Sequence, residues 1–130
     1  MKYLMFIKHA EDYWNRTAPQ ALYDAMGRFV EESFKNGTLV DTAGLKPTRA
    51  GARVRLSGGK LSTTDGPFTE AKEIVGGYAI VNVKSHEQAR ELGEQFMDLH
   101  RVHWPEFEGE CEIRPLEDME DCRSETVAAA

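Results

Sequence analysis

The sequence predicts an α+β domain in which two helices cover one face of a β-sheet. Two segments, residues 2–8 and 78–83, carry apolar side chains on both alternating faces, as central strands that are covered on both sides do. Two other segments have apolar residues at helical spacing. Because 130 residues are the usual size of one domain, we expect these elements to share one hydrophobic core.

The first helix is predicted from about residue 18 to residue 36, after the first strand. Thr17 and Gln20 have the spacing of a capping box, and Gly37 supplies a stop. Apolar or small side chains recur between these signals at Leu22, Ala25, Met26, Phe29, Val30 and Ser33. This spacing gives the helix one face that can pack on the sheet.

The middle of the chain predicts a strand followed by a hairpin. Residues 38–43 form the strand, and residues 53–57 and 60–64 flank the pair Gly58-Gly59, a dipeptide favoured in tight β-turns. A second glycine pair, Gly76-Gly77, precedes the central strand 78–83.

The second helix and a final strand complete the order. Ser85 and Gln88 repeat the capping-box spacing, and Pro105 must end the helix. The apolar face of this helix contains Ala89, Leu92, Gly93, Phe96 and His100. With residues 111–116 as the last strand, the order is the βαββαβ, or split βαβ, arrangement of ferredoxin-like folds, with an inserted hairpin.

The predicted sheet leaves one face without cover. Right-handed crossovers place both helices on the same face, so the other face carries apolar residues of the two central strands. Soluble proteins seldom leave such a patch in water. We therefore expect a homodimer that packs sheet against sheet, a dimeric α/β-barrel type of assembly.

Charge and cysteine content narrow the classes of function. Residues 117–125 hold five acidic side chains and one arginine, so a net charge of only −2 falls on residues 1–116. Without a Lys/Arg stripe, nucleic acid is not an expected partner. The two cysteines, Cys111 and Cys122, and the absence of a secretory signal indicate a cytoplasmic protein.

Two regions follow from this charge distribution. Residues 1–117 are expected to form the folded domain, and residues 118–130 an acidic, disordered tail. The longest apolar run, residues 3–7, is far shorter than the roughly 20 residues of a membrane span, so no membrane contact is expected.

The segment DGPFTEAKE at residues 65–73, followed by Gly76-Gly77-Tyr78, resembles the signature of the DGPF branch of YCII-related proteins. The resemblance covers most of residues 1–117, through MKYLM at 1–5, residues 37–45, the Gly-Lys pair at 59–60 and IRPL at 113–116. It implies a ferredoxin-like dimer. Proteins of this branch often occur near sigma-factor-like regulators, which implies an accessory or sensing role.

The resemblance does not bring a reaction with it. A few YCII relatives act on aromatic or chlorinated compounds with a histidine-aspartate pair, the histidine lying in the first helix. The corresponding stretch here, residues 23–27, contains no histidine.

Asp65 and His9 are the candidate catalytic residues. Asp65, at a strand end beside Gly66 and Pro67, is placed to act as a general base or to orient a ligand. Asp-Gly-Pro is also turn chemistry in its own right, and this structural role is favoured. His9 follows the first strand, where an imidazole can act as a base, although a histidine at a strand end is more often exposed to solvent.

Candidate ligand-binding residues surround the same motif: Phe68, Glu70, Glu73, Gly76 and Gly77. Two carboxylates near Asp65 can supply acid-base chemistry, but a charge run is usually a solvated loop. Phe68 is more often a core residue, and the glycine pair is explained equally well by a bulge.

No metal or cofactor is expected. His100 and His103 lie three residues apart near a helix end, where basic residues are favoured by the helix dipole, and no recognised zinc spacing accompanies them. Tyr13, Trp14 and Trp104 are placed to line an apolar pocket or to seal the rim of the core.

The leading hypothesis is a homodimer that binds a small organic molecule, aromatic or oxidised, in a cleft between sheet and loops, with Asp65 and His9 as polar anchors. The alternative is a non-enzymatic accessory module that binds another protein through its sheet face and acidic tail. A third hypothesis is a cofactor-free enzyme in which Asp65 or Glu73 moves a proton. The sequence leaves open the ligand and whether a reaction occurs.

Overall fold

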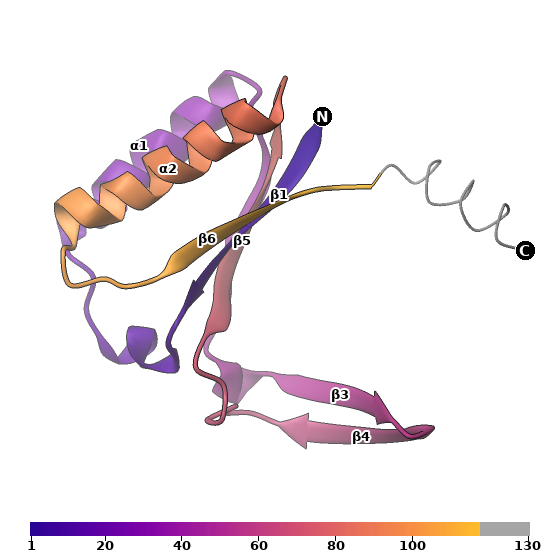
Figure 1. The fold of residues 1–130 in the computed structure, drawn as a ribbon. Helices are drawn as coiled ribbons and strands as arrows, with labels where there is room; N and C mark the ends of the chain where they lie inside the picture. The colour runs from indigo at the N-terminus through magenta and orange to yellow at the C-terminus, as the bar shows by residue number, and fades with distance from the viewer. Residues whose placement is uncertain (118–130) are drawn as a thin grey trace, which may run out of the picture.

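The computed structural model describes residues 1–117, so the predicted acidic tail at 118–130 lies outside the described residues. The chain forms a four-stranded sheet, two α-helices and a separate two-stranded hairpin (Figure 1). The sheet contains β1 (Lys2–His9), β2 (Leu39–Gly44), β5 (Ile74–Asn82) and β6 (Glu110–Pro115). The helices are α1 (Gln20–Lys35) and α2 (His86–His103), and the hairpin is β3 (Ala52–Ser57) with β4 (Lys60–Asp65). Two short 3-10 helices, η1 (Glu11–Asn15) and η2 (Thr48–Ala50), lie in the connections.

The sheet has the order β2-β5-β1-β6, and each neighbouring pair is antiparallel. The two segments with apolar residues on both faces, β1 and β5, are therefore the central strands, as predicted. Both helices cover one face of the sheet, and the hairpin projects on the opposite side (Figure 1). The α+β class is confirmed, and the sheet of one chain stays open instead of closing into a barrel.

The core lies between the sheet and the helices. Tyr3 and Met5 are two residues apart in β1, so both point toward the helices. There they pack with Leu39 of β2 and Val81 of β5. A second buried cluster, formed by Ala18, Leu22 and Trp104, joins the start of α1 to the end of α2. None of the helices in residues 1–117 is long and apolar enough to cross a membrane.

One of the two predicted helix caps forms. The Ser85 hydroxyl accepts a hydrogen bond from the Gln88 amide at 3.1 Å, and the Gln88 side chain accepts one from the Lys84 amide at 2.9 Å. The capping box at Thr17 is wrong. The N-cap position of α1 is Pro19, which has no side-chain donor or acceptor. Thr17 lies two residues before this position and is too early to cap the helix.

The second central strand begins four residues before its predicted start, at Ile74. Gly76 and Gly77 belong to this strand, because backbone pairing needs no side chain. The register shifts between Ile7, opposite Gly77, and Lys8, opposite Val75, so Gly76 is the extra residue of a β-bulge.

The β3-β4 hairpin turns at Gly58-Gly59, as predicted. Both glycines have positive φ, 57° and 76°, which the tight turn requires and other residues rarely adopt. Every residue of the two hairpin strands is exposed, in contrast to the four strands of the sheet.

Candidate functional site

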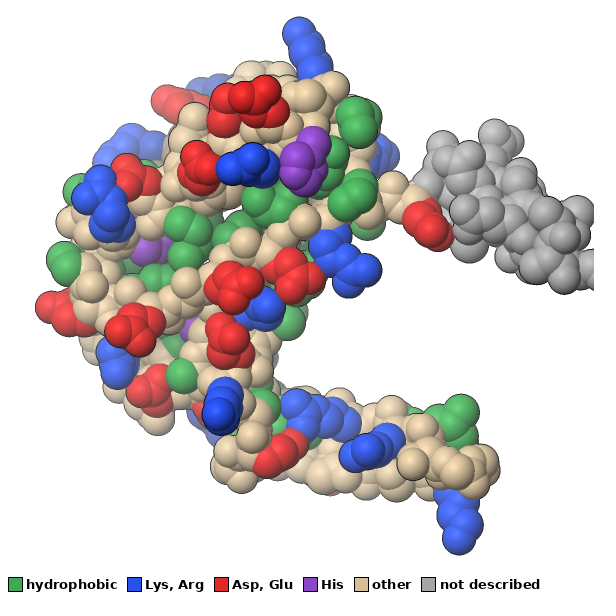
Figure 2. Space-filling view, in the orientation of Figure 1, with side chains coloured by type: hydrophobic (Ala, Val, Ile, Leu, Met, Phe, Trp, Pro, Cys, Tyr) green, Lys and Arg blue, Asp and Glu red, His purple; other side chains and the backbone are tan. Residues whose placement is uncertain are grey.

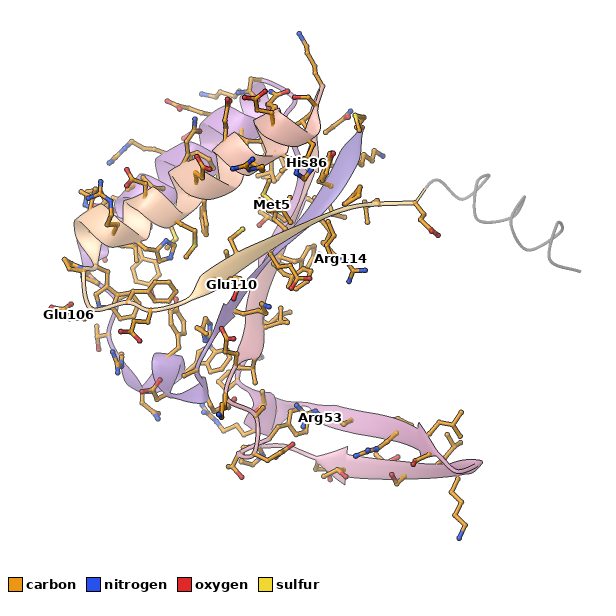
Figure 3. The ribbon with its side chains drawn as sticks, in the orientation of Figure 1. Met5, Arg53, His86, Glu106, Glu110 and Arg114 are labelled. Atoms are coloured by element: carbon orange, nitrogen blue, oxygen red, sulfur yellow. The ribbon has the colours of Figure 1, made fainter. Side chains whose placement is uncertain are left out.

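A cavity of about 310 Å³ lies between the helix-facing side of the sheet and the two helices. Its walls are mostly apolar and include Met5, Ile7, Met26, Phe29, Val30, Leu92 and Phe96. Figure 3 shows Met5 between the sheet and the helices. Few polar side chains reach this space, so those that do determine which ligands it can bind.

His9, the last residue of β1, lines the cavity and is only 4% exposed. Its ring stacks on Tyr13 with centroids 4.0 Å apart and meets the edge of Trp14 at 5.0 Å. The view of His9 as a solvent-exposed residue is therefore wrong. The chain enters η1 directly after β1, and this turn folds Tyr13 and Trp14 over the imidazole.

The proton on the His9 ring is fixed by the backbone. Nδ1 lies 2.9 Å from the carbonyl oxygen of Ala10, and a carbonyl can only accept, so Nδ1 must donate. In the neutral ring, the lone pair is then on Nε2.

Gly76 explains how the ring fits against β5. A Cβ at this position would lie 1.9 Å from His9 Nε2, so only glycine allows the strand and the imidazole to approach this closely. Gly77 also lines the cavity, and a Cβ there would lie 3.1 Å from the carbonyl oxygen of Ala43. The fold thus brings together three of the predicted site residues.

His100 of α2 is the second imidazole of the cavity, and it is 5% exposed. Its Nδ1 lies 3.1 Å from the carbonyl oxygen of Phe96, which again places the lone pair of the neutral ring on Nε2. Burial lowers the pKa of His100, and the nearby His9 lowers it further, against the raising effect of the Phe96 hydrogen bond. The neutral base is therefore the favoured form.

Sequence reasoning considered His100 only as part of an apolar helix face and as a weak metal ligand. The signal that it lies in the cavity was its helical spacing with Leu92 and Phe96, which places all three on the buried side of α2. No group of three or more metal-ligating side chains is found within residues 1–117.

The remaining polar side chains in the cavity are satisfied or neutral. Ser33 donates to the Phe29 carbonyl at 2.7 Å, and Thr42 donates to the Tyr78 carbonyl at 2.8 Å. Burial, with a smaller contribution from Glu110, raises the pKa of the Cys111 thiol to about 11, so the thiol is protonated at neutral pH. The two Nε2 atoms remain as hydrogen-bond acceptors, beside the hydroxyl groups of Tyr13 and Thr38, which also line the cavity.

The DGPF segment lies elsewhere, at the base of the hairpin. Asp65 is exposed at the end of β4, opposite Ala52, and lines neither this cavity nor the one described below. The Gly66 amide donates to the Gly51 carbonyl at 2.9 Å, and the Phe68 amide donates to the Thr48 hydroxyl at 3.1 Å. Within one chain, this segment closes the hairpin onto η2.

Arg53, which is labelled in Figure 3, contacts Phe68 and Glu70 at the same base of the hairpin. Phe68 is buried, with the Arg53 guanidinium 3.9 Å above its ring. Glu70 is exposed and forms an ion pair with Arg53, and its pKa is lowered first by a backbone hydrogen bond and then by this arginine. Glu73 is also exposed, and its charge adds to the carboxylates that raise the pKa of Lys8, chiefly Glu112.

A second, more polar cavity of about 290 Å³ shares His9, Tyr13 and Phe107 with the first. Its other walls include Asp12, Arg16, Trp104, Glu106 and Glu108. The three shared rings form a wall between an apolar space and a charged one. Of the predicted pocket aromatics, Tyr13 lines both cavities, Trp104 lines the polar one, and Trp14 contacts His9.

Two comparisons place the chain among known proteins. A family model described as YCII-related domain matches residues 1–96. An uncharacterized protein of Rhizobium meliloti (strain 1021) is 26% identical over 103 residues, which cover 79% of each chain. The family match includes His9 and the two glycines of β5, but it ends before His100 and Cys111.

Proposed function

This chain belongs to the YCII-related family, and we propose that it is a small-molecule-binding protein of the DGPF branch whose ligand occupies the cavity between sheet and helices. The observation that carries this proposal is the pair of buried imidazoles in a mostly apolar space of about 310 Å³. That volume is at the lower end of the range for ligand sites, so the ligand is small.

The chemistry of the two rings specifies the ligand further. Each imidazole uses Nδ1 to donate to a backbone carbonyl, so each neutral ring offers an Nε2 lone pair. An apolar molecule with a hydroxyl or N–H donor complements this arrangement, because its donor pairs with Nε2 while its hydrocarbon part fills the apolar walls. A neutral imidazole is also a general base near pH 7, so a bound acidic hydroxyl can lose its proton to it.

The proposal retains His9 and gives the second polar position to His100. Asp65 stays a prediction as a catalytic residue, since nothing in one chain brings it to the cavity. No cofactor is required for proton transfer between a ligand and an imidazole. The cytoplasmic location also stays a proposal, based on the low number of cysteines.

A ferredoxin-like arrangement and a homodimer are part of the same proposal. The order β2-β5-β1-β6, with α1 following β1 and α2 following β5, supports the first. Support for the second comes from the face of the sheet without helices, where Leu4 lies opposite Ile80 and Phe6 opposite Tyr78. This apolar centre is suited to a second copy.

The test is a thermal-shift screen of small hydroxylated and amino-substituted organic molecules, each paired with its O-methyl or N-methyl analogue. We expect hits that depend on the donor and are lost in His9→Gln or His100→Gln, while His103→Gln and Asp65→Asn retain them. His103 is a suitable control because it lies in the same helix and lines neither cavity. A ligand at about 100 times its Kd should stabilise the protein by about 2.7 kcal/mol.

The opposite pattern would reject the site. Hits that survive both cavity substitutions but disappear in Asp65→Asn would return the ligand to the hairpin base. Equal binding of donors and methylated analogues would show that Nε2 does not accept a hydrogen bond from the ligand.

A further inference from the structure

The β3-β4 hairpin has two chemically different faces. Residues opposite each other in an antiparallel pair point to the same side, so Leu56 with Leu61 and Val54 with Thr63 form one face. Arg53, Arg55 and Lys60 point to the other face. The hairpin is therefore amphipathic. Arg53 on the basic face contacts Phe68 and Glu70, whereas the apolar face stays exposed within residues 1–117.

The apolar face is unusually exposed. Val54 and Leu56 are each 70% exposed, and Leu61 is 73% exposed, the largest values among the big hydrophobic residues of the described chain. A two-stranded hairpin alone is marginally stable in water. Three aliphatic side chains on one side of such an element indicate a contact that residues 1–117 of one chain do not make.

The position of the hairpin favours a contact with another copy of the chain on the open face of the sheet. The hairpin projects on the side of the sheet that has no helices, and Figure 2 shows a hollow between this arm and the body, with hydrophobic side chains near its tip. Six residues per strand give an arm of about 20 Å, and packed sheets lie about 10 Å apart. An arm of this length would reach past the sheet of a copy seated on the open face.

Charge supports a second copy as the occupant. Residues 52–65 contain three basic side chains and one acidic side chain, a net charge of +2. The other residues up to 117 contain 12 basic and 17 acidic side chains, a net charge of −5. A positive arm on a negative body is attracted to the body of another copy, and twofold symmetry makes the contact twice.

We propose that the β3-β4 hairpin is a dimerisation arm, which packs the apolar face of Val54, Leu56 and Leu61 on the second copy of this chain. The inference rests on the proposed homodimer and adds a contact that the sheet faces alone do not provide. The DGPF segment then has a role in assembly, because it fixes the base of the arm through Gly66 and Phe68.

Sedimentation velocity on the full chain tests the arm. The wild type should sediment as a dimer of two 14.7 kDa chains. In the variant Leu56→Ser/Leu61→Ser, the dissociation constant should rise about tenfold or more, because four exposed leucines of the dimer lose their apolar contact. The control Ser57→Ala/Ser62→Ala changes the neighbouring positions, which point to the basic face, and should leave the constant within about threefold.

The outcomes separate this inference from the proposals on which it rests. A wild-type dimer with the same dissociation constant in the leucine variant would overturn the arm and leave the sheet-face dimer standing. A wild-type monomer at about 100 µM would overturn both, since stable protein–protein interfaces dissociate only at much lower concentrations. Ligand binding to the cavity is read separately in the histidine variants.

Discussion

The sheet and the hairpin use the same secondary structure and have opposite relations to the solvent. In β1, Tyr3, Met5 and His9 are buried, whereas no residue of β3 or β4 is buried. The hairpin does not lack apolar residues, since it carries Val54, Leu56 and Leu61. Strand formation in this chain therefore does not depend on burial, and the comparison separates side chains that hold the monomer together from side chains available to a partner.

The largest expected effect contrasts two leucines. Leu22 of α1 is fully buried and packs with Trp104, while Leu61 is 73% exposed on the hairpin. We expect Leu22→Ala to lower the free energy of unfolding by about 2–5 kcal/mol, because it leaves a cavity. Leu61→Ala should change it by about 0.5 kcal/mol or less in the monomer. Urea unfolding at low protein concentration measures both, and equal losses would contradict the division between the two regions.

A smaller effect contrasts two glycines that line the same cavity. In Gly76→Ala the new methyl group meets the His9 ring, so we expect a loss of about 1–3 kcal/mol from overpacking, with a shift of the His9 ring signals in NMR spectra. Gly44→Ala meets nothing within 4 Å and should cost about 0.5 kcal/mol or less. If both variants leave the His9 signals unchanged, the close approach of β5 to the imidazole is wrong.

The smallest effect is a pH dependence confined to the sheet and helices, since the hairpin has no histidine. The pKa of His100 is lowered in the folded protein from its ordinary value of 6.5, so below that value the unfolded chain binds more protons. Stability is then complete above pH 6.5 and falls as the pH decreases toward the folded pKa. Melting temperatures between pH 5 and 8 should show this loss in the wild type and in His103→Gln, and a weaker loss in His100→Gln.

Much of the fold was predictable because its signals are local. The two-sided apolar pattern of β1 and β5 identified the central strands, and Gly58-Gly59 identified the turn. The first residue of each helix was harder to predict than the central strands. Ser85 caps α2 with the hydrogen bond that its spacing predicts. The same spacing at Thr17 gives no cap, because Pro19 occupies the N-cap position of α1.

The candidate site was predictable only in part, because it depends on how distant segments meet. His9 and the glycines of β5 were singled out separately, yet their contact arises from the antiparallel register of β1 and β5. The burial of His9 depends on η1 folding back over it, which a single histidine does not signal. His100 lies 91 residues further along the chain and reaches the same cavity through the packing of α2 on the sheet.

The register of β1 also has a consequence for synthesis on the ribosome. This strand is made first of those described, but its partners are β5 and β6, which end at residues 82 and 115. At about 5–20 residues per second, β1 waits roughly 4–15 s for β5 and 5–20 s for β6, and until each partner is made the corresponding edge is unpaired and open to other chains. The hairpin, whose strands are neighbours in sequence, closes within about 1–10 µs of leaving the ribosome. The nascent protein therefore completes its exposed arm before its sheet, and a chaperone that protects it should bind the first ten residues.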